Sequence, residues 1–173
     1  AGLKVHGAYA QFETEPVERV RITGGVRYER GDQFVEPIDL FGLGGSDIIP
    51  TRLNTDYWLP AGTITWNFAE DMQLRLSAGK TIARPQFREL APQFYLDTES
   101  DRTSLGNQFL IDSQLVNADA RWEWYFGREQ RLTVGAFWKR INNPIEAIAF
   151  RQGNAFFQTF ANAPKARLYG AEL

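Results

Sequence analysis

Hydrophobic and polar residues alternate one by one along several stretches of the chain. From Arg19 to Arg30, most even positions carry apolar residues, tyrosine or glycine, and most odd positions carry charged residues or threonine. Side chains of a strand point alternately to opposite faces, so this period of two predicts a strand with one apolar and one charged face. Three further segments show the same alternation: Met72–Ile82, Leu115–Phe126 and Gln130–Ile141.

Three weaker segments complete the predicted strands: Leu3–Phe12, Ala61–Phe68 and Ala166–Leu173. The second begins after Pro60, because proline cannot donate a ladder hydrogen bond and is confined to edges, strand starts and bulges. The four strong segments have 11 or 12 residues, whereas strands of globular proteins usually have about five or six and transmembrane strands about 9–11. The alternation is still running at Leu173, so we expect the last strand to continue further.

The connections between the predicted strands alternate strictly between short and long. The short ones are Glu13–Glu18, Ala69–Asp71 and Gly127–Glu129, and the long ones are Gly31–Pro60, Ala83–Gln114 and Asn142–Lys165. In an up-and-down meander, alternate connections lie at opposite ends, so all the long loops share one end. Outer-membrane barrels have this layout, while connections above about 12–15 residues are uncommon in compact domains. We therefore predict an all-β, antiparallel up-and-down meander that forms part of a transmembrane β-barrel.

Two long connections have recognisable content. Ile145–Arg151 and Ala155–Phe160 flank Gln152-Gly153-Asn154, which predicts a hairpin inside a loop. The glycine-rich stretch Phe41–Ser46 predicts irregular structure.

Composition excludes several classes of protein. The 173 residues contain 19 Lys and Arg against 21 Asp and Glu, no cysteine and one histidine. This excludes disulfide scaffolds, cysteine nucleophiles, zinc–thiolate sites and multi-histidine metal sites, and it lacks the basic excess of nucleic-acid binders. No apolar run approaches the roughly 18 residues of a transmembrane helix, and the first residues lack the signal-peptide pattern.

The unusual feature is a high aromatic content, with 13 Phe, 6 Tyr and 5 Trp. On the apolar face these residues gather toward the strand ends: Tyr28 and Trp138 near the long loops, and Trp66, Phe68, Trp122, Trp124 and Phe126 near the short turns. Trp and Tyr concentrate at bilayer interfaces, so this distribution favours an apolar face that meets lipid. The alternative is a soluble all-β ligand- or sugar-binding module, which would bury that face. The residues that decide between them are Val116, Ala120, Trp122, Leu132, Val134 and Trp138.

Several sequence segments resemble segments of the β-barrel of TonB-dependent outer-membrane receptors. Leu74–Phe87 contains Lys80-Thr81-Ile82-Ala83-Arg84-Pro85 and runs on to Pro92, and it resembles the family's strand end that opens an external loop. Four other phrases agree with this family in order and spacing: Gly24–Glu29, Ala120–Phe126, Val134–Ile145 and Lys165–Leu173.

The resemblance implies a 22-stranded barrel closed by an N-terminal plug. Residues 1–173 would then be part of a single β-barrel domain, with about seven strands and no plug domain. The implied function is TonB-dependent uptake of a nutrient, such as an iron chelate or a carbohydrate, in the bacterial outer membrane, and not catalysis. The implied partners are outer-membrane lipid, the rest of the barrel and plug, the TonB inner-membrane complex and the small-molecule nutrient, with no nucleic acid.

The candidate ligand-contacting residues are aromatic side chains of the long loops, Phe41, Phe94, Tyr95 and Phe109. They could stack on a sugar or on the ring of a chelate, or pack the loops against one another. Three alternate carboxylates, Asp97, Glu99 and Asp101, could offer oxygen ligands to Ca²⁺, but a solvated acidic loop is the simpler interpretation.

No catalytic, cofactor-binding or metal-binding residue is predicted. Asp119 and Glu123 lie four positions apart with Arg121 between them, too far apart along a strand for the usual glycosidase carboxylates, so they indicate a salt-bridged lumen face. A β-rich hydrolase is a third possibility, without a compact motif. His6 lies on the polar face of the first strand with no nucleophile nearby. Arg84-Pro85 has a structural interpretation, since proline ends strand pairing.

Overall fold

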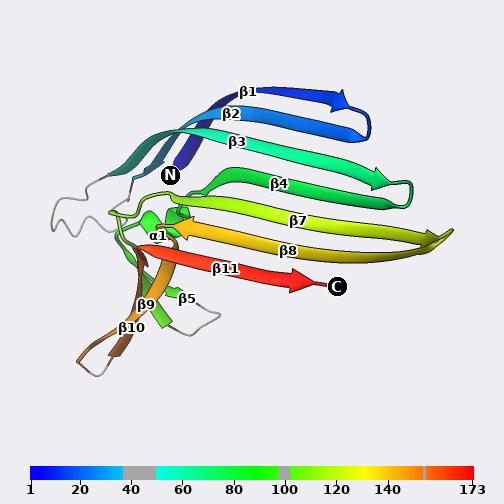
Figure 1. Ribbon diagram of the computed structural model, residues 1–173. Coiled ribbons are helices and arrows are strands. Elements are labelled where there is room, and N and C mark those ends of the chain that lie inside the picture. The colour runs from blue at the N-terminus through cyan, green and yellow to red at the C-terminus, as the bar shows by residue number, and fades with distance from the viewer. Residues whose placement is uncertain (37–49, 98–101, 154) are drawn as a thin grey trace.

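The computed structural model describes residues 1–36, 50–97, 102–153 and 155–173. Seven antiparallel strands form one sheet (Figure 1). In spatial order they are β1 (Gly2–Val17), β2 (Val20–Val35), β3 (Thr51–Ala69), β4 (Met72–Ala83), β7 (Ser113–Gly127), β8 (Gln130–Asn142) and β11 (Lys165–Glu172). Within the described residues the sheet stays open, with β1 and β11 at its edges. The predicted all-β meander is confirmed as an open section of a barrel-like sheet.

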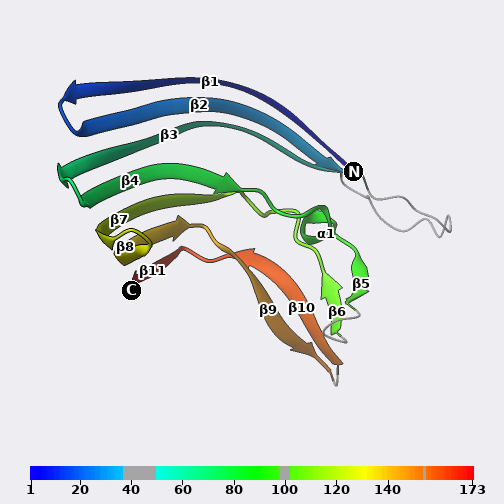
Figure 2. The same cartoon turned by 90° about the vertical axis from the view of Figure 1, so that its right-hand side faces the viewer.

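A smaller sheet and one helix lie at the end of the long connections (Figure 2). The smaller sheet has the order β5 (Phe94–Asp97), β6 (Arg102–Leu105), β10 (Ala155–Asn162) and β9 (Ile145–Gln152). Its β6 and β10 run parallel, and its other pairs are antiparallel. The helix α1 (Phe87–Leu90) follows β4. No helix in the described part of the chain is long and apolar enough to span a membrane.

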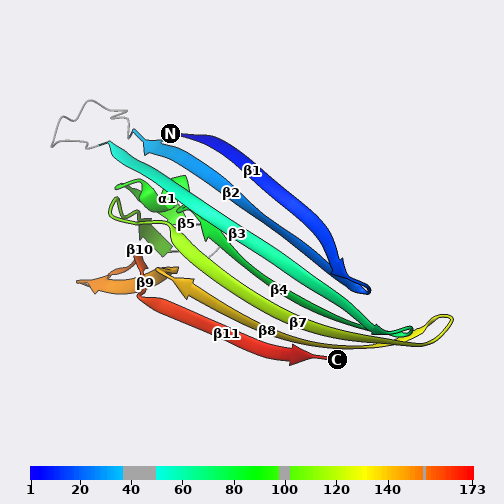
Figure 3. The same cartoon turned by 45° about the horizontal axis from the view of Figure 1, so that its top comes forward.

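The turns and loops are sorted to opposite ends of the main sheet, as the alternation of connection lengths predicts (Figure 3). The predicted hairpin is also present, since β9 and β10 pair antiparallel around Gly153, whose φ of 63° is well tolerated by glycine. The predicted irregular stretch 41–46 lies outside the described residues.

The predicted ends of β2 and β3 are wrong. The two strands continue pairing past Gly31 and Thr55 up to Val35 and Thr51, where the sequence predicts a loop. Pro60 therefore lies inside β3, opposite Val26. It is tolerated because the pairing of β3 with β4 stops at residue 61, which leaves the first half of β3 as an edge on that side.

The first predicted turn is also shorter than the pattern indicates. β1 continues to Val17, and Arg19 adopts a φ of 68° in the tight turn to β2. The pairing of β1 with β2 shifts between Thr14 and Val17, so an irregularity in the ladder accommodates the residues that the sequence analysis assigns to the turn.

The hydrophobic core is small and lies at the loop end. Its buried residues are Val35, Leu90, Ala91 and Leu110, and Leu53, Ile145 and Phe160 pack against them. The sheet face against which α1 packs is called the inner face below, and the opposite face is the outer face.

The six residues that distinguish a lipid-facing surface from a soluble core are not buried in the described structure. Val134 is 37% exposed and Trp138 is 39% exposed, and the remaining four are partly exposed. No second sheet of the described chain covers them, since the smaller sheet stands at the loop end (Figure 2). The covered core that a soluble sandwich requires is therefore missing from the described residues.

Candidate functional site

The outer face carries a continuous apolar band. Residues that lie directly opposite each other in neighbouring strands share a face, so the register identifies the rows of this band. One row crosses the whole sheet: Phe12, Gly24, Gly62, Ala78, Ala118, Trp138 and Tyr169. Much of this face is open to its surroundings, and Tyr169 is 79% exposed.

Aromatic pairs mark the ends of the band. At the loop end, the rings of Tyr28 and Trp58 are 5.0 Å apart. At the turn end, Trp66 contacts Phe68 with centroids 5.4 Å apart, and the Trp122–Trp124–Phe126 series has centroid separations of 6.5 and 5.1 Å. Such rows are typical of the two interfaces of a bilayer.

The loop end of the band moves along the strands from one side of the sheet to the other. On β8 the change from apolar to charged lies between Trp138 and Arg140, and on β3 it lies between Trp58 and Asp56. Trp138 is level with Gly62 through β7 and β4, so the boundary on β3 lies four residues further toward the loops than on β8. On β4 the change lies between Ala78 and Lys80, at the level of β8, and on β2 it lies between Tyr28 and Arg30, at the level of β3. The band therefore extends further toward the loops on β2 and β3 than on β4 and β8.

The inner face carries a buried ion pair at the loop end. Glu29 of β2 accepts a hydrogen bond from Arg84 Nη1 at 2.6 Å and one from Arg27 Nε at 3.0 Å. The side chains of Glu29 and Arg84 are only 11% and 14% exposed. Gly31 makes room for this arrangement, because a Cβ at that position would lie 2.6 Å from Arg84 Nη2.

The start of α1 is fixed to the same part of β2. Gln33, only 3% exposed, donates from Nε2 to the carbonyl oxygen of Pro85 at 2.7 Å. β4 ends at Ala83, so Arg84 and Pro85 open the connection, in agreement with their structural interpretation. The backbone N–H of Gln86 then donates to Glu89 Oε2 at 2.8 Å, which satisfies a free donor at the helix start.

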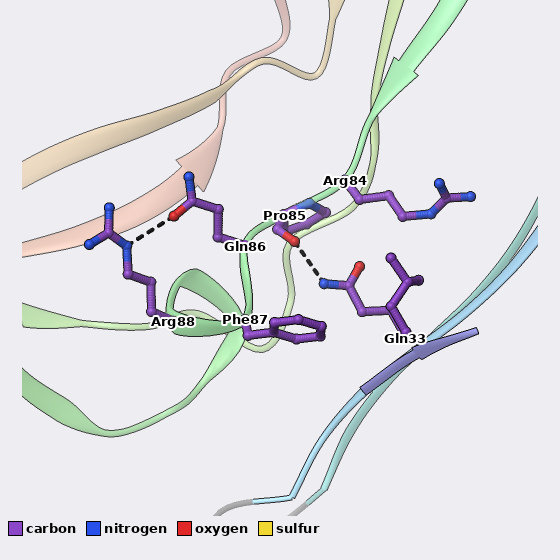
Figure 4. Close-up of a pocket in the computed structure, with 7 residues that line it drawn as sticks. Gln33, Arg84, Pro85, Gln86, Phe87 and Arg88 are labelled. Carbon is purple, nitrogen blue, oxygen red and sulfur yellow. Dashed lines mark hydrogen bonds between the residues drawn. The ribbon is translucent and has the colours of Figure 1, made fainter. Parts of the chain in front are cut away.

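A pocket of about 520 Å³ opens beside these contacts, between the start of α1 and the edge of β1 and β2. Figure 4 shows Gln33 and Arg84 on one side of the Pro85–Phe87 segment and Arg88 on the other. Arg88 donates to Gln86 Oε1 at 2.9 Å and is exposed. Within the described residues, Arg84 Nη2 and Gln33 Oε1 are buried without a hydrogen-bond partner. The pocket thus combines two cations, one aromatic ring and unsatisfied polar atoms.

The predicted ligand-contacting aromatics do not gather in this pocket. Phe94 lies on the smaller sheet, 60% exposed, with its ring 5.8 Å from that of Phe157. Tyr95 follows it along β5 and therefore points to the other face of that sheet. Phe109 is 80% exposed in the connection to β7, and Phe41 lies outside the described residues.

The smaller sheet also forms an aromatic cluster that the sequence pattern does not predict. Phe157 of β10 lies between Phe94 and Phe150, with its ring centroid 5.6 Å from that of Phe150. Alternation within the predicted hairpin was the available signal, but the parallel pairing of β6 with β10 joins two different loops and has no local sequence signature.

The candidate acidic sites do not form a described metal or catalytic centre. Glu99 and Asp101 lie outside the described residues, and only the backbone of Asp97 is described. In the rest of the described chain, no three potential metal ligands come together. Glu123 is 4% exposed and pairs with Arg121 at 3.1 Å, whereas Asp119 is exposed.

His6 is exposed and lies opposite Arg30. It stands on the outer face, two residues beyond the Tyr28 row, and not on the inner face that carries most of the charges. The polar face predicted for β1 is therefore part of the outer face, and His6 lies on it between the apolar band and the loops.

Taken together, the apolar outer face, the polar inner face and the sorted loops define a section of a transmembrane-type β-barrel. A family model described as "TonB dependent receptor-like, beta-barrel" matches residues 2–173. The chain therefore belongs to the TonB-dependent receptor family and represents part of its β-barrel. Comparison with curated proteins gives no match.

Solved structures with the same fold are much longer. The Serratia marcescens hemophore receptor HasR, in complex with its hemophore HasA and heme, gives a TM-score of 0.71 at 18% identity over 98% of this chain and 31% of that chain. The siderophore receptor PirA from Pseudomonas aeruginosa gives 0.73 at 16% identity over 98% and 30% of the two chains. The FrpB iron transporter from Neisseria meningitidis gives 0.62 at 12% over 98% and 22%. The chain thus spans less than a third of each of these proteins.

Proposed function

We propose that this chain is part of the membrane-spanning barrel of a bacterial outer-membrane receptor that imports an iron chelate with energy transmitted by TonB. The observation that carries the proposal is the apolar band on the outer face, which no second sheet of the described chain covers and which aromatic pairs border at both ends, as expected of strands that cross a bilayer. Membership of the TonB-dependent receptor family supports the mode of transport. The partners are then outer-membrane lipid, the rest of the barrel, a plug and the TonB complex.

An iron chelate is favoured over a carbohydrate by two observations. The similar structures are named as receptors for a hemophore or siderophore, or as an iron transporter. The pocket beside α1 presents Arg84, Arg88 and Phe87. Ferric siderophores and haem combine negative charge with flat rings, and guanidinium groups bind carboxylate and phenolate oxygens through charge-assisted hydrogen bonds.

The proposal is tested in a strain that lacks the gene of the complete receptor. We expect deletion to abolish uptake of one iron-labelled siderophore or of haem, and the intact gene to restore it. In the restored strain, Arg88→Ala should weaken binding by about tenfold or more, since a hydrogen bond to a charged group contributes about 1.5–3 kcal/mol. Arg52→Ala is the matched control, because Arg52 is an exposed arginine that pairs with Asp32 away from the pocket.

Two outcomes would contradict this assignment. Normal iron uptake together with a growth defect on one carbohydrate would identify the other predicted substrate class. Equal binding by the Arg88→Ala and Arg52→Ala receptors would remove the pocket beside α1 from the ligand site while leaving the transport function in place.

A further inference from the structure

Three cations gather on the outer face at the loop end of β8 and β11. Arg140 of β8 and Arg167 of β11 are directly opposite each other in the ladder. Lys165 lies two residues from Arg167 along β11, on the same face and nearer the loops, opposite Asn142. Directly opposite side chains have Cβ atoms only about 4.5–5.5 Å apart, and like charges in such positions destabilise a sheet.

No carboxylate compensates these charges in the described part of the chain, where none of the three cations takes part in a salt bridge. The polar contact of Arg140 is its hydrogen bond from Nε to Asn142 Oδ1 at 3.0 Å. Lys80 of β4 lies in the same row across the sheet as Arg140, through Val116 of β7. Its ammonium group, however, lies over the Tyr57 ring, 5.9 Å from the centroid.

On the other side of the sheet, the cations at the corresponding level have carboxylate neighbours. There Arg30 lies opposite Asp56, and Lys4 lies opposite Asp32, which also pairs with Arg52 at 3.1 Å. The cations of β8 and β11 differ because no carboxylate lies opposite them in the ladder.

The position of the three cations relative to the apolar band indicates what they meet. Arg140 and Arg167 directly follow the row of Trp138 and Tyr169, the last aromatic row of the band on these strands. Aromatic side chains of this kind mark the level of lipid headgroups. The cations therefore stand where a bilayer around the band would place the phosphate groups of its lipids.

We propose that Arg140, Arg167 and Lys165 bind the phosphate group of an anionic lipid headgroup in the membrane leaflet at the loop end. A guanidinium fork matches phosphate oxygens in two-point contacts, and Lys165 adds a mobile third donor. A bound phosphate would attract both guanidinium groups and so offset the repulsion between the opposed arginines. The proposal rests on the proposed function in one respect, since it requires that the sheet be embedded in a membrane.

The test uses the complete receptor in phosphatidylcholine bilayers that contain either lipid A or lipid A from which the phosphates have been removed. Bound lipid is counted by native mass spectrometry after extraction in detergent. We expect the wild-type receptor to retain the phosphorylated lipid at least about tenfold more tightly, because each surface cation contributes roughly 1 kcal/mol toward an anionic leaflet. The triple variant Arg140→Gln, Arg167→Gln, Lys165→Gln should lose this preference.

A variant with Lys4→Gln and Arg30→Gln is the matched control, and it should keep the preference because its cations already have carboxylate neighbours. Equal lipid retention by the triple variant and the wild type would overturn the proposal, and so would displacement of the lipid by millimolar inorganic phosphate, which would identify a soluble anion site. Failure of the wild-type receptor to insert into the bilayers would instead overturn the proposed function. Iron-chelate uptake by the triple variant should stay normal.

Discussion

Arg84 and Glu29 form a 2.6 Å ion pair that joins the first residue after β4 to the inner face of β2, 55 positions earlier in the chain. Both side chains are largely withdrawn from solvent, and Gln33 holds the next residue, Pro85, by a hydrogen bond. The pair thereby fixes the point where the chain leaves the sheet and enters the connection that carries α1 and the candidate pocket.

Removing either partner of this pair should destabilise the receptor. We expect Glu29→Gln or Arg84→Gln to lower the free energy of unfolding by about 2–4 kcal/mol, because each leaves a largely buried charge without its main partner. The measurement is urea unfolding of the complete receptor in phospholipid vesicles. The double variant should cost less than the sum of the single ones, since the two side chains interact directly.

Arg52→Gln is the control for this prediction. Its ion pair with Asp32 is longer, at 3.1 Å, and the two side chains are 61% and 32% exposed. We expect a loss below about 1 kcal/mol, as is typical of surface pairs. Equal losses for Arg52→Gln and Arg84→Gln would contradict a special role for the buried pair.

Gly31→Ala should disturb the same ion pair without changing any charge. The added methyl group would meet Arg84 Nη2 at 2.6 Å, and Arg84 cannot move away freely while Glu29 holds it. We expect a loss of about 1–3 kcal/mol from this overpacking, measured by the same unfolding experiment. In an Arg84→Ala background the loss should largely disappear.

Gly135→Ala provides the comparison for Gly31→Ala, because the nearest heavy atom to a Cβ there is the carbonyl oxygen of Ala120 at 4.0 Å. This substitution should change stability by less than about 0.5 kcal/mol. A Gly31→Ala loss that persists unchanged without Arg84 would show that the backbone, and not the guanidinium group, requires glycine.

The sequence predicts the presence of the seven long strands because apolar and polar residues alternate over part of each, most clearly in the four segments of 11 or 12 residues. Strand ends are harder to predict where both faces of a strand carry polar residues. Beyond Tyr28, β2 carries Arg30 and Asp32 on the outer face and stays paired with β3, so the loss of apolar alternation marks the end of the band and not the end of the strand. The alternation places His6 on the polar face of its strand for the same reason, and only the register with Arg30 shows that this face is the outer one.

The candidate site is less accessible to sequence analysis than the fold. Arg84-Pro85 stands out in the sequence, but its partners Glu29 and Gln33 come from another strand and become visible only through the sheet register. The aromatic cluster around Phe157 likewise depends on pairing between two different loops. Contacts of this kind join distant segments and leave no periodic pattern along the chain.

Lysine substitutions at two adjacent positions of β8 should have very different effects. Val134 lies on the outer face opposite Trp122, and Thr133 lies on the inner face opposite Glu123. Val134→Lys should lower the unfolding free energy by about 2–4 kcal/mol in vesicles, because it places a charge in the middle of the lipid-facing band. Thr133→Lys faces a carboxylate and should cost less than about 0.5 kcal/mol. Equal costs would contradict a lipid-facing band.

Asn162 should hold two of the long connections together. Its Nδ2 donates to the carbonyl oxygens of Ile111 and Asn143, at 2.9 and 2.8 Å, and its Oδ1 accepts the Ile111 N–H at 2.9 Å. Asn162→Ala removes all three hydrogen bonds, which contribute about 0.5–1.5 kcal/mol each. We expect the Ile111 amide to exchange with solvent at least about tenfold faster, measured by hydrogen exchange on the complete receptor.

The exposed Asn54 of β3 is the control residue for this last experiment, since it lies on the outer face away from both connections. Asn54→Ala should leave exchange at Ile111 unchanged. Because Asn162 is the last residue of β10, its loss should also loosen the β9–β10 hairpin and increase protease cleavage there. Unchanged exchange at Ile111 in the Asn162→Ala receptor would mean that the apolar contacts of Leu110 with its neighbours in the core hold the connection in place without the amide.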